Sequence, residues 1–186
     1  MYQIRNFTDN DDIRTLQEMG PFRVIEYTRD LSVAPQNAQE AYFCNVRKRQ
    51  VICTLGASNI TLQAGAMQWM LGDVHATTGI KGVGDLFGKA VRGKMTGESA
   101  IKPEYTGNGL LVLEPTYKHI LLLDVGAWNG SIVIEDGMFM ACDAALKHKA
   151  VMRSNLSSAV AGNEGLFNLG LQGNGVVCLE SNEPKE

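Results

Sequence analysis

Short apolar segments separated by glycine dominate the chain from Arg49 onward. Within each segment, apolar residues alternate with polar ones or run together over roughly four to eight positions, and turns follow about every ten residues, a spacing typical of an all-β sandwich or barrel. We predict strands at 50–55, 60–63, 66–71, 98–105, 110–114, 120–125, 131–135, 138–142, 148–153, 165–171 and 176–180. In the strand at 66–71, Met67 and Trp69 are expected to share one face, because side chains alternate along a strand.

Residues 1–48 have a different pattern. Alternation at 22–28 predicts a strand, and the good helix formers that follow Pro35 predict a short helix at 35–44. The basic run at 47–49 is interpreted as a solvated turn before the next strand. We therefore predict a single domain, in which an N-terminal extension of residues 1–48 packs on a body of residues 49–186.

The body contains an internal duplication. Residues 98–114 align without gaps on residues 164–180 at an offset of 66, and the match continues more weakly upstream, where 60–65 faces 132–137 at an offset of 72. Both copies carry Gly-Asn-Gly, which predicts a hairpin turn because glycine and asparagine tolerate positive φ. We predict a β-sandwich built from a first repeat at about 50–114 and a second repeat at about 122–180.

Composition and charge narrow the class of protein. Glycine occurs 20 times and proline 5 times, which indicates tight turns between strands, and 17 basic against 20 acidic residues give a net charge of −3 that argues against nucleic acid as a partner. No apolar stretch approaches the roughly 20 residues of a membrane helix, and the acidic N-terminus does not resemble a signal peptide. We expect a cytoplasmic protein with reduced, mostly buried cysteines at positions 44, 53, 142 and 178.

Motifs of known chemistry are missing from the sequence. The three histidines, at 75, 119 and 148, form no metal-binding pattern; Asp73 and His75 could offer two ligands from one strand face, without an evident third. Glu98 and Glu164 are equivalent positions of the two repeats, interpreted as structural hydrogen-bond acceptors in preference to paired acid–base carboxylates. The glycine-rich basic segment 79–93 fits no phosphate-binding motif and predicts a loop with a short helix. We assign no catalytic, cofactor-binding or metal-binding residues.

Four segments together resemble a known family. Residues 60–70, 96–99, 136–141 and 162–167 look like the altered-inheritance-of-mitochondria protein 24 family, and the resemblance covers about 50–180. It implies a β-sandwich like that of the tryptophan RNA-binding attenuator protein, with repeated strand units that often assemble into oligomers. The mitochondrial members are linked to inner-membrane organisation. Family members usually continue with further strands after the segment that resembles 176–180, and a missing third unit would leave an open sheet edge.

These observations lead to three hypotheses about function. The leading one is a non-enzymatic protein without cofactors that acts through self-assembly, as a homo-oligomer, or through contacts with other proteins. The second is an attenuator-like module that binds a small molecule or RNA. The third is an enzyme, which requires Glu98, Glu164 and a histidine to converge in one pocket.

Overall fold

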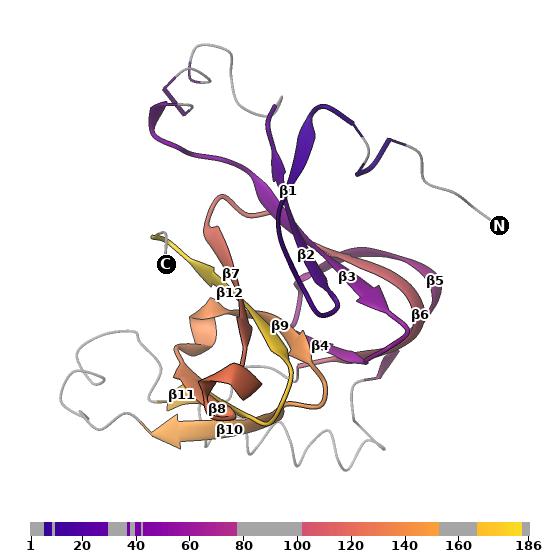
Figure 1. Ribbon diagram of the computed structural model, residues 1–186, viewed down its shortest axis with the longest axis vertical. Helices are drawn as coiled ribbons and strands as arrows, with labels where there is room; N and C mark the ends of the chain where they lie inside the picture. The colour runs from indigo at the N-terminus through magenta and orange to yellow at the C-terminus, as the bar shows by residue number, and fades with distance from the viewer. Residues whose placement is uncertain are drawn as a thin grey trace.

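The computed structural model describes residues 6–8, 10–29, 37, 40–41, 43–77, 102–152 and 167–183. Twelve strands and two short 3₁₀ turns make up most of these residues (Figure 1). Their bounds are β1 Ile13–Met19, β2 Phe22–Tyr27, β3 Arg49–Leu55, β4 Ile60–Leu62, β5 Met67–Thr77, β6 Glu104–Leu113, β7 His119–Asp124, η1 Gly126–Trp128, β8 Ser131–Ile134, η2 Asp136–Met138, β9 Phe139–Asp143, β10 Lys147–Met152, β11 Phe167–Gln172 and β12 Val176–Ser181. The all-β prediction is confirmed.

The strands form two antiparallel sheets. The larger follows the order β1-β2-β3-β6-β4-β9-β12-β7, with β5 also paired to β6, and the smaller follows the order β10-β11-β8. The strand β6 pairs with β5 along one edge, and with β3 and then β4 along the other. Strand β6 therefore bends and connects β5, β3 and β4 within one nearly closed antiparallel sheet.

The N-terminal extension joins the larger sheet. Its hairpin of β1 and β2 pairs with β3 along the whole of β2, where Phe22 faces Cys53 and Glu26 faces Arg49. The strand β1 was not predicted, because only alternate residues of this edge strand are half-buried and its polar residues mask the pattern. Of the predicted helix at 35–44, the described residues Asn37, Glu40, Ala41 and Phe43 are helical, and the Cys44 N–H donates to the Glu40 carbonyl at 2.9 Å.

The hairpin prediction for the two Gly-Asn-Gly segments is wrong. Residues 107–109 lie inside the continuous strand β6, and residues 173–175 connect β11 to β12, which belong to different sheets. The glycines allow close approach of a neighbouring backbone: a Cβ on Gly109 would lie 2.1 Å from the Leu71 carbonyl oxygen. Glycine is required because the chain bends here against another strand.

Strand pairing follows one register in both predicted repeats. In the ladder of β5 and β6, Met70 faces Leu111; in the ladder of β9 and β12, Cys142 faces Val177. Corresponding residues differ by 72 on one strand and by 66 on the other, which are the offsets of the sequence alignment.

The same offsets extend past the glycines. His75 faces Thr106 in β5 and β6, and Lys147 faces Gln172 in β10 and β11. The long strands β5 and β6 thus correspond to β9 with β10 and to β11 with β12.

A β-bulge occurs at the same place in the ladder of β5 and β6 and in the ladder of β9 and β12. In the first of these ladders the bulge puts Met67 and Trp69 against different core clusters. The prediction that Met67 and Trp69 share a face is therefore wrong.

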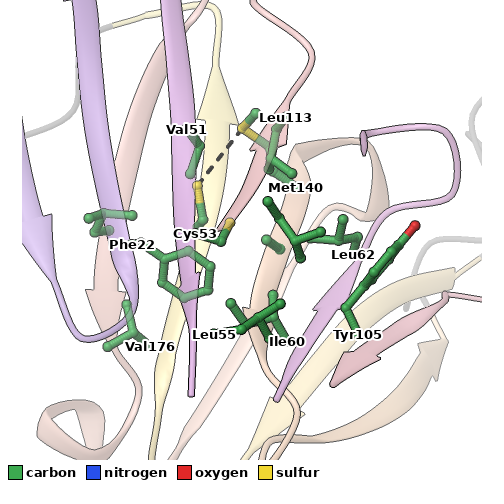
Figure 2. Packing of buried hydrophobic residues seen from close by; sticks show 14 of the residues in the cluster. Phe22, Val51, Cys53, Leu55, Ile60, Leu62, Tyr105, Leu113, Met140 and Val176 are labelled. Carbon is green, nitrogen blue, oxygen red and sulfur yellow. Dashed lines mark hydrogen bonds between the residues drawn. The ribbon is translucent and has the colours of Figure 1, made fainter. Parts of the chain in front are cut away.

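The largest core cluster lies between the sheet regions of the two predicted repeats. Side chains from β2, β3, β4, β6, β9 and β12 meet in it, as Figure 2 shows. The second repeat has its own cluster, which includes Ile134, Phe139, Leu171 and Val177. The outer face of the first repeat carries a third, smaller cluster around Ile25, Ile52 and Val112.

Candidate functional site

An apolar groove lies on the second predicted repeat. Its volume is about 580 Å³, and strands β7 and β8 with the turns η1 and η2 supply most of its wall. The residues that line it are Gln17, Ile120, Leu121, Leu122, Leu123, Trp128, Ile132, Val133, Ile134, Glu135, Met138 and Leu179. Ten of these twelve side chains are apolar, so the groove suits an apolar occupant.

Local sequence explains how the groove residues are placed. Both β7 and β8 carry apolar residues at successive positions, so each strand is apolar on both faces. Residues from both faces of each strand line the groove, and most of them also pack against a core cluster. Trp128 at the end of η1 and Val133 in β8 remain 59% and 52% exposed. Exposed large apolar side chains beside a groove are typical of an interaction surface.

Trp128 and Val133 were not among the residues predicted from the sequence to have a functional role. The available signal was the run Ser131–Ile134, in which three successive β-branched apolar residues leave no polar face. Such a strand needs cover on both sides.

A second cluster brings together titratable and nucleophilic side chains. The largely buried Lys102 ammonium lies 2.9 Å from Asp136 Oδ1, 3.0 Å from Gln63 Oε1 and 4.9 Å from the centre of the Phe139 ring. Beside it, His148 Nε2 lies 3.3 Å from Cys142 Sγ.

The electrostatics of this cluster oppose nucleophilic chemistry. Burial, followed by the Asp143 carboxylate, raises the pKa of Cys142 to about 12. Burial and the nearby Lys102 charge lower the pKa of His148. The pair is therefore a neutral thiol beside a neutral imidazole at pH 7, whereas a reactive cysteine needs a thiolate.

The basic run at 47–49 is not wholly solvated, which corrects the interpretation from sequence. Arg49 is 4% exposed, and both its Nε and an Nη lie 3.0 Å from Glu26 Oε2. Glu26 is itself buried and also accepts from Arg14 at 2.6 and 3.0 Å. This buried network joins the N-terminal hairpin to β3.

Comparison with known proteins places the chain in a family. A family model described as Mitochondrial biogenesis AIM24 matches residues 44–185. The chain belongs to the AIM24 family. The predicted family resemblance is confirmed.

Solved structures share the fold of this chain. Protein SPYM3_0169 from Streptococcus pyogenes matches with a TM-score of 0.55 and 22% identity, over 91% of this chain and 64% of that chain. This identity shows a shared fold only. The present chain spans somewhat less than two thirds of that protein's length. No curated protein matches.

Among the described residues, the candidates named from the sequence of this AIM24-family chain lie in separate places. His75 and Asp73 are exposed and lie 2.9 Å apart on β5. His119 lies at the start of β7 and faces Ser181, whereas Cys142, the partner of His148, faces Val177 near the other end of β12. Glu98, Glu164 and the segment 79–93 lie outside the described residues.

Two further findings concern only the described part of the chain. It contains no group of three or more His, Cys, Asp or Glu side chains placed to hold a metal ion. None of its helices is long and apolar enough to cross a bilayer.

All four cysteines are free, and the prediction that most are buried is confirmed at Cys53, Cys142 and Cys178.

Acidification is expected to destabilise the fold through His148. Its folded-state pKa is lowered by burial and by Lys102, so between that value and the unfolded value near 6.5 the unfolded chain binds a proton that the native state does not. This contribution to stability is present above about pH 6.5 and is lost as pH falls through the folded-state pKa. Urea titrations at pH 7.5 and pH 5 should show a smaller pH dependence in His148→Gln than in wild type; an unchanged difference would contradict the prediction.

Proposed function

We propose that this AIM24-family protein acts without catalysis, through self-assembly or contacts with other proteins. The groove on the second repeat supports this proposal, because it gathers apolar side chains from β7, β8 and η1 at the surface. The exposed Trp128 lies at its rim, and tryptophan is enriched among residues that dominate binding energy at interfaces. An attenuator-like architecture with two repeats is part of the proposal, supported by the shared strand registers.

The two other hypotheses have weaker support. The groove falls within the roughly 300–1,000 Å³ of small-molecule sites, which favours a small apolar ligand over RNA. The enzyme hypothesis stays a prediction, since it depends on Glu98 and Glu164. A cytoplasmic location also stays a prediction, and the free cysteines agree with it.

Light scattering tests the assembly. We expect wild type at micromolar concentration to exceed the 20.2 kDa mass of one chain. Trp128→Asp should return it to the single-chain mass, because a carboxylate at the groove must be desolvated on association. The control Met152→Asp, on the exposed side of β10 outside the groove, should assemble like wild type. A strict monomer in the wild type would refute self-assembly, and binding of an apolar probe by that monomer would favour the small-molecule module.

A further inference from the structure

We propose that strand β8 of one copy pairs with strand β5 of a second copy, in the antiparallel register that places Val133 opposite Met70. The inference rests on the proposed self-assembly and names the surfaces that make it. It follows from a pairing that already exists within the chain, between the two predicted repeats.

The internal template is the ladder of β4 and β9. Thr61 in the first repeat faces Cys142 in the second, and the Ala144 N–H donates to the Asn59 carbonyl at 2.9 Å. Moving Thr61 forward by the offset of 72 gives Val133 in β8. Moving Cys142 back by the same offset gives Met70 in β5. The β8 and β5 edges are therefore the counterparts of two edges that are already joined.

Both counterpart edges are open among the residues that the structure describes. There, β8 pairs only with β11, and β5 pairs only with β6. In Figure 1, β5 lies on the right of the molecule and β8 at the lower left, so one chain cannot join its own two edges as they stand. A second copy offers each edge the partner that it lacks.

The backbone of β5 is oriented to accept a new strand. The carbonyl oxygens of Leu71 and Asp73 face β6, since each lies close to where a Cβ on Gly109 or Gly107 would be. Across a trans peptide, N–H and C=O point in opposite directions. The N–H of Gly72 therefore points away from β6, in the way that the Ala144 N–H points from β9 to β4.

Side-chain exposure supports the register. Met70 is 46% exposed and Val133 is 52% exposed, although both are apolar. Their counterparts Cys142 and Thr61, which face each other within the chain, are 0% and 8% exposed. Pairing between copies would bury Met70 against Val133 as directly opposed cross-strand neighbours.

The position of the groove also supports strand β5 of a second copy as the partner of β8. Its residues Leu121, Leu123 and Leu179 correspond to Val51, Cys53 and Leu113, because the paired strands share one register. Those first-repeat residues are fully buried in the cluster that contains Met140 and Ala141 of β9. A β5 strand from a second copy would cover the groove as β9 covers the first repeat. Such a contact uses different surfaces on the two copies, so it builds a ring or a filament.

Cysteine pairing tests the register directly. In a Cys44→Ser background, which removes the exposed thiol, one sample carries Met70→Cys and the other carries Val133→Cys. Mild oxidation of the mixture should give a linked dimer, because directly opposed residues lie within disulfide range. The matched control replaces Val133→Cys by Met152→Cys, an exposed residue of β10. We expect about tenfold more linked dimer than in the control, since pairing raises the local thiol concentration.

The outcomes separate this inference from the proposed function. Wild type that assembles by light scattering, with no more linkage in the mixture than in the control, would overturn the pairing and leave self-assembly standing. Linked dimer from either single variant alone, at the level of the mixture, would also overturn the register. A strict monomer would overturn the pairing together with self-assembly. Selective linkage of the mixture, with assembly lost in Val133→Lys, is the expected result, because an inward charge blocks edge pairing.

Discussion

Glu26→Gln is expected to lower the free energy of unfolding by about 3–5 kcal/mol, the range found when one member of a buried ion pair is removed. Glu26 is 2% exposed, and its two carboxylate oxygens accept hydrogen bonds from Arg14 and Arg49. Glutamine preserves the volume and removes the charge. The Arg49 guanidinium, with 5% of its side chain exposed, is then left without a buried counter-charge.

Urea titration at pH 7 measures this effect, and an exposed pair provides the control. Glu18 pairs with Arg23 on the same hairpin, with both side chains about half exposed. Glu18→Gln should change stability by no more than about 1 kcal/mol, as surface pairs do. The double variant Glu26→Gln with Arg49→Met should recover much of the loss, because no unpaired buried charge remains. A loss within about 1 kcal/mol for Glu26→Gln alone would show that the ion pair does not hold the hairpin on β3.

Periodicity predicted the strands better than it predicted their connections. Alternation located β2, and short apolar runs located β3, β7, β8 and β12, because each of these strands has an apolar face that must be buried. It did not locate β1, whose polar residues lie on an exposed sheet edge. It also gave no means of separating a strand that bends between sheets from two strands joined by a turn. Gly-Asn-Gly is compatible with both, and only the partner strand β5 decides the matter at residues 107–109.

The site depended on contacts that sequence patterns do not report. Arg49 stands in a run of three basic residues, and its burial follows from Glu26, which lies 23 residues earlier in the chain. The groove is formed by β7, β8 and Leu179 of β12, and its opening depends on which strands cover the second repeat. The offset of 72 between the two predicted repeats was nevertheless readable in the sequence, and it relates Val133 to Thr61.

Gly107→Ala is the second change with a large expected effect. Gly107 has φ of +112°, and a Cβ there would lie 2.0 Å from the Asp73 carbonyl oxygen, which belongs to the backbone and cannot rotate away. Backbone strain alone costs about 1–3 kcal/mol, and separation of β5 from β6 adds to it. We expect a total loss of about 3 kcal/mol or more in urea titration.

Two other glycines make the test specific for close approach. Gly173 is the counterpart of Gly107 and also has positive φ, at +128°, but its Cβ would meet nothing nearer than 3.5 Å. Gly137 has neither a positive φ nor an atom within 4 Å of its Cβ. Alanine should therefore lower the free energy of unfolding most at Gly107 and less at Gly173. At Gly137 it should change the free energy of unfolding by no more than about 0.5 kcal/mol. Equal losses at Gly107 and Gly173 would mean that backbone conformation, and not the Asp73 carbonyl, requires glycine in both segments.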